Sequence, residues 1–297
     1  MITVSVIIVS WNTKQLLRQC LNSLISNFES QISKLRTEII VVDNASVDGS
    51  WEMVEQEFPQ VKLIKNKSNL GFAKGNNLGA AEATGELLFF LNSDTVIKSG
   101  SIEKLALFLS QNSKLGAVSP LLLNNDETIQ RDPAYLCPPS FGRAVFYYNR
   151  WLKNLVSCFW PDVLFSRINL KKATDVEQLS GAALMIRKKV FEKIGGFDEG
   201  FLFYFEDVDL CFRLRKAGYR LMVLPWAQII HYGGESTKRV IQKEGEERRY
   251  FLNFASLFLF CEKHYAPIQT KLIQAVVLSY LILGRRLSLV GQLIKRR

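Results

Sequence analysis

The chain has 297 residues, 48% of them apolar and 22% charged, so it can bury one large core with a small appendage left over, and this composition excludes a disordered protein. Its five cysteines are widely spaced and include no C-x-x-C pair, so neither a disulfide framework nor a zinc site is indicated and a reducing cytoplasm fits. The formal net charge is +10, of which residues 268–297 supply +6 from six Lys or Arg and no acid, leaving +4 for the rest.

Strand and helix patterns alternate over the first 120 residues. Met1 leads directly into an apolar run with no basic region before it, so we interpret residues 2–9 as a core strand and not as a signal peptide. Apolar residues then recur at helical spacing from Leu16 to Ile25, which favours a right-handed crossover. The expected strands lie near residues 3–9, 38–42, 61–64, 86–91 and 116–119. This alternation predicts an α/β fold with a doubly wound, mostly parallel sheet.

The middle of the chain has a different pattern. Between residues 120 and 175, five prolines interrupt regular structure among aromatic residues, and we interpret this segment as a mobile, partly ordered region on the acceptor side. One strand is expected near residues 176–186 and another at residues 221–224. Between them, residues 207–217 are expected to form a helix that Gly218 ends.

Two apolar stretches, residues 250–261 and 272–284, follow near the C-terminus. Each is shorter than the roughly 20 residues that a membrane-spanning helix needs, so we expect them to lie on a membrane rather than cross it. The second is flanked by Lys271 and by Arg285 and Arg286, which suits anionic headgroups. Packing of both helices on the core or on a second subunit is the alternative. The apolar face expected to meet the membrane consists of Leu272, Ile273, Val276, Val277, Tyr280 and Leu281.

A polar triplet, Asn92, Ser93 and Asp94, follows the apolar run 87–91, where an α/β sheet opens its ligand crevice. A carboxylate at a strand end can bind Mg²⁺ or Mn²⁺ while substrate phosphates complete the coordination shell. His231, one of only two histidines, sits beside a polar loop, and an imidazole with a carboxylate tolerates Mn²⁺ better than Mg²⁺. Alone, Asp94 could cap the next helix and His231 could be structural.

A second acidic cluster, Glu206, Asp207 and Asp209, opens the expected helix 207–217. Acids stabilise a helix N-terminus through the helix dipole, which accounts for one or two of the three. The same dipole lowers the pKa of Asp207, so a general base at this position needs neighbouring negative charge, which Glu206 and Asp209 can supply. One acidic cluster that holds a metal and another that removes a proton suit the transfer of a sugar from a nucleotide.

Two further segments suit a nucleotide. Asp43 ends the second expected strand, where it can accept a hydrogen bond from a base imide or a ribose hydroxyl, or else form a turn, whereas Asp48 is interpreted as structural. The glycine-rich segment 69–77 opens a helix, so its backbone can approach a ligand closely. It matches neither G-x-G-x-x-G nor a P-loop, which weakens the dehydrogenase and P-loop ATPase alternatives.

Six strings carry a resemblance to a known family, and they occur in the family's order. They are VSVIIVSWN (4–12), VDNAS (42–46), GFAKGNN (71–77), LNSDT (91–95), GFDE (196–199) and EDVDL (206–210). Over about residues 3–240 the chain resembles glycosyltransferase family 2, most closely the rhamnosyltransferase-like branch that builds bacterial surface polysaccharides. The resemblance implies a GT-A fold and an inverting transfer from a nucleotide-sugar donor.

The resemblance also implies roles for individual residues. Asp207 is the general base, beside Glu206 and Asp209, and Asp94 and His231 are ligands of a divalent cation, Mg²⁺ or Mn²⁺. Separately from the resemblance, Gly181 and Ala182 are interpreted as lining the acceptor side, because small side chains let a sugar ring approach, and tight strand packing is the alternative. Many family members have Asp where this chain has Asn92, a departure that would weaken metal binding. A Q-x-x-R-W string is absent, which implies one sugar per encounter. The nucleotide-sugar-binding residues implied are Asn12, Asp43, Asn44, Gly71, Lys74, Asn76, Asn92 and Ser93.

The expected organisation is a catalytic domain over residues 1–240, with a nucleotide-sugar half at about 1–120 and an acceptor half at about 121–240, and a C-terminal amphipathic, basic helical region over residues 241–297. The expected activity is transfer of L-rhamnose from dTDP-rhamnose to a lipid-linked or cell-surface polysaccharide precursor, at the inner face of the cell membrane. Another UDP- or dTDP-sugar, or a non-catalytic scaffold subunit, is the alternative. A homodimer is possible, and no nucleic-acid partner is expected because the basic residues lie beside apolar stretches.

Overall fold

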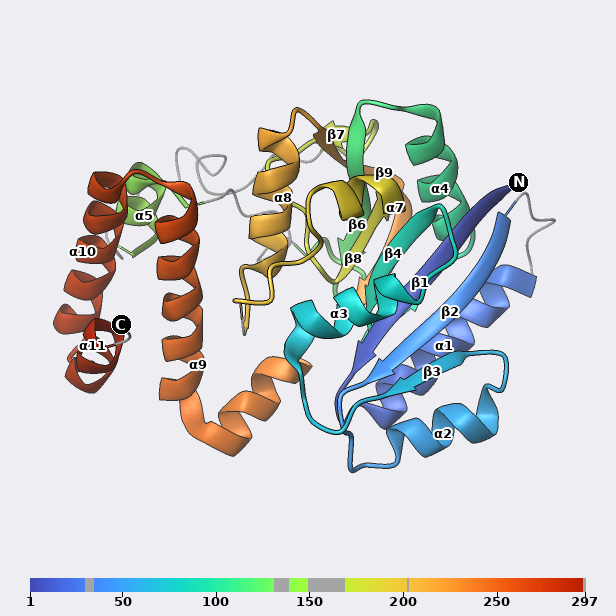
Figure 1. The fold of residues 1–297 in the computed structure, drawn as a ribbon, viewed down its shortest axis with the longest axis horizontal. Helices are drawn as coiled ribbons and strands as arrows, with labels where there is room; N and C mark the ends of the chain where they lie inside the picture. The colour runs from blue at the N-terminus through green and yellow to red at the C-terminus, as the bar shows by residue number, and fades with distance from the viewer. Residues whose placement is uncertain (30–34, 131–138, 149–168, 202, 296–297) are drawn as a thin grey trace. The chain divides into compact units, whose positions relative to one another are not determined.

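The computed structural model describes residues 1–29, 35–130, 139–148, 169–201 and 203–295 (Figure 1). The chain divides into two compact units. The first comprises Met1–Tyr135, Ile168–Glu199 and Glu206–Gly233, and the second comprises Leu136–Arg167, Gly200–Phe205 and Gly234–Arg297. The predicted domain boundary at residue 240 falls inside a helix of the second unit.

The first four long strands form the parallel part of one sheet, in the order β3-β2-β1-β4. These strands are β1 (Ile2–Ser10), β2 (Leu35–Asp43), β3 (Lys62–Lys65) and β4 (Leu87–Asn92). Strands covered by helices on both faces are apolar along almost their whole length, and β1, the second half of β2 and β4 fit this description. The doubly wound start of the fold predicted from the sequence is confirmed.

Helices α1 (Lys14–Glu29), α2 (Ser50–Glu57) and α3 (Gly71–Ala81) connect these strands, with α1 and α3 on opposite faces of the sheet (Figure 1). The glycines of α3 have a packing role that the sequence did not predict. A Cβ on Gly79 would lie 2.4 Å from Cγ2 of Ile7, and one on Gly75 would lie 3.0 Å from both methyl groups of Val9. Gly75 and Gly79 therefore bring the helix close to β1.

The rest of the sheet is mixed, because β8 runs antiparallel between β4 and β6. β9 pairs in parallel with β6 and antiparallel with β5 and β7. The expected strand 176–186 begins only at Ala183, whereas the strand expected at 221–224 extends over twelve residues. The elements are β5 (Thr95–Ile97), α4 (Ser101–Gln111), β6 (Leu115–Leu123), β7 (Thr174–Asp175), β8 (Ala183–Arg187), α7 (Lys188–Lys193), α8 (Glu206–Lys216) and β9 (Arg220–His231).

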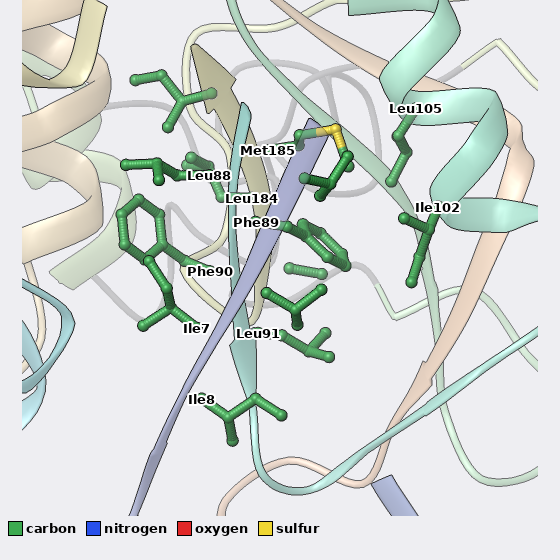
Figure 2. Close-up of a cluster of buried hydrophobic side chains, with 14 of the residues drawn as sticks. Ile7, Ile8, Leu88, Phe89, Phe90, Leu91, Ile102, Leu105, Leu184 and Met185 are labelled. Atoms are coloured by element: carbon green, nitrogen blue, oxygen red, sulfur yellow. The ribbon is translucent and has the colours of Figure 1, made fainter. Parts of the chain in front are cut away.

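The core of the first unit surrounds β4. Figure 2 shows Leu88 and Phe90 on one side of this strand and Phe89 and Leu91 on the other, as the two-residue period of a strand requires. All four side chains are buried, and each contributes about 1.5–3 kcal/mol of burial free energy. This double-sided burial fixes where β4 ends and so positions the polar triplet that follows it.

The second unit consists of helices: α5 (Phe141–Tyr148), α9 (Glu235–His264), α10 (Pro267–Leu283) and α11 (Leu287–Ile294). α9 is interrupted at Gly245, which has φ 83° and ψ 167°. α10 packs against α5, α9 and α11. In the described part of the chain, no helix is both long enough and apolar enough to cross a membrane.

The apolar face expected to meet a membrane needs correction. Ile273, Val277 and Leu281 are buried inside the second unit, on the side of α10 that packs against its neighbouring helices. Only Leu272 and Tyr280 of the expected set count among the exposed large apolar side chains. α10 is apolar around most of its circumference, so the sequence pattern alone did not distinguish its inner face from its outer face.

Candidate functional site

Three parallel strands end together at one edge of the sheet. Ser10 of β1 is in register with Asp43 of β2, and Val9 with Asn92 of β4. The carboxyl ends of parallel strands are where open α/β sheets bind their ligands. This edge therefore collects the segments that follow β1, β2 and β4.

Asp43 holds an unpaired acceptor at this edge. Its Oδ1 accepts a hydrogen bond from the backbone N–H of Ser46 at 2.8 Å, whereas its Oδ2 is buried and has no partner. Burial raises the pKa of the Asp43 carboxyl, and the hydrogen bond from Ser46 opposes that shift. An unsatisfied buried acceptor costs about 1–3 kcal/mol, so Oδ2 is prepared to accept a hydrogen bond from a ligand N–H or O–H.

Asn12 and Asn44 bind loops of the protein. The Asn12 side chain accepts a hydrogen bond from the N–H of Val47 at 2.7 Å, and its backbone has a positive φ of 55°. Asn44 is buried, donates to the carbonyl of Gly71 at 3.1 Å and accepts from the side chain of Asn66 at 2.9 Å. Both asparagines thus stabilise the loops at the strand ends, so any contact they make with a nucleotide uses their remaining atoms.

The other predicted nucleotide residues differ in accessibility. Asn76 is buried and donates to the carbonyl of Phe72 in its own helix at 3.0 Å, whereas Lys74 is exposed on α3. Gly71 begins α3 with a positive φ of 82°. Ser93 is buried and accepts a hydrogen bond from Thr13 at 3.0 Å. Of this group, Lys74 and the backbone of Gly71 are the better placed to reach a ligand.

Asp94 and His231 are brought together by strand pairing. Thr95 of β5 lies opposite His231 of β9, and the N–H of Tyr232 donates to the carbonyl of Asp94 at 3.0 Å. The carboxylate Oδ1 of Asp94 lies 3.4 Å from Nε2 of His231. The side-chain amide of Asn92 lies 3.3 Å from the same ring nitrogen. Asn92, Asp94 and His231 therefore form one polar group, although Asn92 and His231 are 139 positions apart in the chain.

Gln130, which the sequence analysis missed, orients the His231 ring. Its Nε2 donates to the carbonyl of His231 and to the side chain of Asn124, both at 3.2 Å, so its Oε1 faces the ring nitrogen Nδ1 at 2.7 Å. Nδ1 must then carry a proton. A neutral His231 consequently presents the lone pair of Nε2 toward Asp94.

This donor set fits a divalent cation. A carboxylate oxygen and an imidazole lone pair that face each other repel unless a proton or a metal ion lies between them. A second residue that fixes the tautomer of a ligating histidine is a regular feature of metal sites. No group of three or more His, Cys, Asp or Glu suited to a metal occurs in the described residues, so two protein ligands would leave the remaining positions to substrate phosphates and water.

Asp207 lies at the start of α8 with both carboxylate oxygens facing backbone donors. Oδ2 accepts from the N–H of Gly181 at 2.9 Å, and Oδ1 accepts from the N–H of Val208 at 2.8 Å. Burial raises the pKa of Asp207, and these hydrogen bonds act in the opposite direction. A raised pKa suits a group that must take up a proton during turnover.

Glu206, the residue before Asp207, forms an electrostatically interacting pair of acids with it. Its Oε2 is buried without a hydrogen-bond partner, and burial together with the nearby charge of Asp207 raises the pKa of Glu206 to about 8. Near neutral pH the pair therefore carries less than two negative charges. Tyr204 and Phe205, just before Glu206, both have positive φ values, of 63° and 71°, and such backbone strain in bulky residues often marks a functional segment.

Asp209 has a different set of contacts from its neighbours. It is buried, and its Oδ2 lies 2.6 Å from Nη2 and 2.7 Å from Nε of Arg213, one turn later on α8. Arg213 also donates to the carbonyls of Ile194 and Gly196. Asp209 thus fixes an arginine that holds the turn at Gly195 and Gly196, a role that the sequence analysis did not predict.

The same turn is bound to α3. The side-chain amide of Asn77 donates to the carbonyl of Phe197 at 2.9 Å and accepts from the N–H of Phe197 at 3.0 Å. Arg213 and Asn77 therefore connect α8, which carries Asp207, to α3, which carries several of the predicted nucleotide-binding residues. Asn77, unlike Arg213, lies within a motif noted in the sequence, but its contact partner is 120 residues away.

The segment Gly181-Ala182 joins the two acidic groups. The N–H of Asn92 donates to the carbonyl of Ala182 at 2.9 Å, and the N–H of Gly181 donates to Asp207. A Cβ on Gly181 would lie 3.3 Å from Phe72 of α3 and 3.4 Å from Cβ of Asp207, so a glycine lets these three elements converge. Gly181 and Ala182 thus connect Asn92, at the end of β4, to Asp207, at the start of α8.

Comparison with known proteins finds relatives that are named as glycosyltransferases. A family model described as glycosyl transferase family 2 matches residues 5–195, and one described as the N-terminal domain of galactosyltransferase matches residues 164–233. The N-acetylglucosaminyl-diphospho-decaprenol L-rhamnosyltransferase of Mycobacterium tuberculosis is 29% identical over 218 residues, 68% of each chain. The low-salt glycan biosynthesis hexosyltransferase Agl10 of Haloferax volcanii is 27% identical over 266 residues, 88% of this chain and 78% of its own.

Solved structures share the fold at lower identity. GalNAc-T7 with UDP, GalNAc and Mn²⁺ has a TM-score of 0.59 and is 17% identical, over 96% of this chain and 58% of its own. The mannosyltransferase PcManGT from Pyrobaculum calidifontis, in complex with GDP-Man and Mn²⁺, has a TM-score of 0.57 and is 18% identical, over 99% and 74%. The predicted GT-A fold is confirmed by these matches.

Proposed function

The chain belongs to glycosyl transferase family 2 and is a glycosyltransferase that uses a nucleotide-sugar donor, and from this premise we propose that it transfers L-rhamnose, with inversion, from dTDP-rhamnose to a hydroxyl of a lipid-linked glycan. The observation that carries the proposal is the bridge formed by Gly181 and Ala182, which connects Asn92, beside Asp94, to Asp207. A donor held near Asp94 and an acceptor held near Asp207 would meet beside Gly181 and Ala182.

Asp207 is the proposed base. An acceptor hydroxyl attacks C1 of the sugar while the bond from C1 to the diphosphate oxygen breaks, and the hydroxyl proton passes to the Asp207 carboxylate. One carboxylate suffices because no covalent sugar intermediate forms when the configuration inverts. The hydrogen bonds from Gly181 and Val208 fix the carboxylate and leave each oxygen a second lone pair for the proton.

Asp94 and His231 are the proposed ligands of a divalent cation, Mg²⁺ or Mn²⁺. A bound cation would neutralise charge on the departing diphosphate. Support comes from the facing lone pairs of Asp94 and His231 and from the tautomer that Gln130 fixes. GalNAc-T7 and PcManGT share this fold and have Mn²⁺ in their structures, which supports the use of a divalent cation.

The proposed donor and acceptor are supported by the contacts of Asp43 and by the name of a relative. The unpaired Oδ2 of Asp43 suits the imide N–H of thymine, which uracil also carries. The M. tuberculosis relative is named as a rhamnosyltransferase that acts on a lipid diphosphate, which favours rhamnose and a lipid-linked acceptor. The absence of a Q-x-x-R-W string favours transfer of one sugar per encounter.

The test is a donor panel. Purified protein is incubated with dTDP-rhamnose, UDP-glucose, UDP-N-acetylglucosamine and GDP-mannose, together with a short polyprenyl-diphosphate N-acetylglucosamine, and products are read by mass spectrometry. We expect a product heavier by one deoxyhexose, formed only with dTDP-rhamnose, and an inverted anomeric configuration by NMR. Transfer from another donor would overturn the rhamnose assignment, and a retained configuration would overturn the single-base mechanism.

A further inference from the structure

The outer face of the C-terminal helices is apolar and exposed. Thirteen large apolar side chains are exposed among the described residues, and seven of them lie between positions 268 and 294. We define the outer face as the side of α10 and α11 that carries Ile268, Leu272, Ile282, Leu283, Leu287 and Ile294. Their exposure ranges from 41% for Leu272 to 84% for Leu283.

Helical spacing places these α10 residues on one side. Positions 268, 272, 275, 279 and 282 follow each other at intervals of three or four, and Ala275 and Ser279 complete the stripe without adding a charge. Ile273, Val277 and Leu281 occupy the opposite side, and their burial satisfies the packing needs of the second unit. A helix that is apolar on both sides normally has both covered, so the outer face calls for an occupant.

Positive charge surrounds this face. Residues 263–297 contain seven Lys or Arg and no Asp or Glu. Lys271 and Arg285 are exposed at the two ends of α10, and Lys295 is exposed at the end of α11. Among the described residues, Arg285 and Arg286 have no carboxylate within ion-pair distance. The occupant therefore has to supply negative charge at the rim and an apolar interior.

A pair of arginines adds a local anion site beside the apolar face. The guanidinium carbon of Arg286 lies 3.9 Å from the centre of the Tyr250 ring, and that of Arg249 lies 4.5 Å from the same ring. Nε of Arg249 is buried without a hydrogen-bond partner. Two guanidinium groups held on one aromatic ring present several donors with the geometry that phosphate accepts.

We infer that the second unit docks on an anionic lipid surface, with the outer face inserted among the acyl chains and the flanking cations on the headgroup phosphates. α10 has 17 residues and spans only about 25 Å, which suits a helix that lies in the interface and not one that crosses a core of about 30 Å. A second copy is a poorer occupant, because its own basic rim would face this one. The inference deepens the proposed function and rests on it only for the lipid-linked acceptor.

Vesicle flotation tests the charge component. Full-length protein is mixed, without donor, with vesicles of phosphatidylcholine alone or with phosphatidylglycerol added. We expect flotation with the anionic vesicles and a weaker, salt-resistant remainder in high salt. The triple variant K271Q/R285Q/K295Q is expected to bind about 100-fold more weakly, since each cation near an anionic surface contributes about fivefold. The control K171Q/K172Q/K189Q removes the same charge from exposed lysines of the first unit and is expected to float like the wild type.

A second pair of variants tests the apolar component. Leu283→Gln removes the most exposed side chain of the outer face and is expected to reduce the salt-resistant binding about tenfold, whereas Leu170→Gln, an exposed leucine of the first unit, is expected to change nothing. Equal flotation of all variants, or no flotation of the wild type with anionic vesicles, would overturn the inference. A wild-type dimer that Leu283→Gln dissociates would assign the face to a second copy.

Two further measurements separate this inference from the proposed function. Thermal melting and dTDP binding of every variant are expected to match the wild type, which shows that the fold and the donor site are intact. Because flotation is measured without donor, a wrong assignment of the sugar leaves its result unchanged. Conversely, a wild type that transfers rhamnose but does not float refutes the lipid surface alone.

Discussion

Asp94, which follows β4, and Asp207, at the start of α8, are the same residue type, but their surroundings differ. Asp94 faces the side chain of His231, whose Nε2 also lies near the amide of Asn92, and Gln130 holds the histidine with a lone pair toward Asp94. Asp207 faces backbone N–H groups and a second acid, and burial raises its pKa. The same side chain therefore has a different chemical environment in each place, and the proposed roles, cation binding for Asp94 and proton transfer for Asp207, rest on those neighbours.

Removing the acceptor-side carboxylate should have the largest effect. Asp207→Asn keeps the size of the side chain but cannot take up a proton, so we expect turnover to fall about 10²–10⁴-fold while dTDP binding stays near that of the wild type. Turnover is measured by dTDP release. The control is Asp175→Asn. It removes an exposed acid of β7 that pairs with Arg215, a residue of α8, the helix that also carries Asp207. A wild-type rate for Asp207→Asn would mean that another group is the base.

The third acid of the cluster should behave as part of the scaffold. Arg213→Gln leaves the buried Asp209 without its ion-pair partner, and we expect a loss of about 2–3 kcal/mol in the free energy of unfolding, measured by urea denaturation. Arg215→Gln breaks an exposed ion pair with Asp175 and should cost less than about 1 kcal/mol. If both variants lose the same stability, the role assigned to Asp209 is wrong.

Gln130 offers a way to weaken the cation side alone. Gln130→Leu removes the acceptor that fixes the His231 tautomer, so we expect the Mn²⁺ concentration needed for half-maximal turnover to rise about 10–100-fold. Gln130→Glu retains an acceptor for Nδ1 but loses the donor to Asn124 and to the His231 carbonyl, so it should lie between Gln130→Leu and the wild type. Saturating Mn²⁺ should restore the maximal rate of Gln130→Leu; a rate that stays low at saturation would place Gln130 in another role.

The acid pair should make the stability of the protein depend on pH. The pKa of Glu206 is raised to about 8 in the folded protein, so between its ordinary value near 4.5 and about 8 the folded state holds a proton that the unfolded state has lost. Stability from this group is therefore complete below pH 4.5 and is lost as the pH rises toward 8. The melting temperature should fall less between pH 5 and pH 8 in Glu206→Gln than in the wild type, and an unchanged slope would show that Glu206 is not the titrating group.

The strands that carry the site could be predicted because burial on both faces leaves a continuous apolar run. β1 and β4 have such runs, and their ends locate Asn12 and Asp94 directly. β5 and β7 have three and two residues, too few to show any period, and so they were missed. Parts of the predicted acceptor-side region, residues 131–138 and 149–168, lie outside the described residues.

The contacts that orient the site could not be predicted, because they join distant positions through side chains that carry no local pattern. Gln130 reaches His231 across 101 positions, and Asn77 reaches Phe197 across 120. A glutamine after a turn and an arginine within a helix are common everywhere in sequences. The sequence analysis explained the glycines of α3 only by close approach to a ligand. Gly75 and Gly79 are also needed because a Cβ there would clash with β1, a contact that the local sequence cannot show.

The division of labour between Asp94 and Asp207 is tested most directly by calorimetric titration with dTDP. The wild type, Asp94→Asn and Asp207→Asn are each titrated in Mn²⁺ and again after chelation. We expect Mn²⁺ to strengthen dTDP binding in the wild type and in Asp207→Asn to the same degree, and to have no effect in Asp94→Asn. Loss of the Mn²⁺ effect in Asp207→Asn together with its persistence in Asp94→Asn would contradict the account.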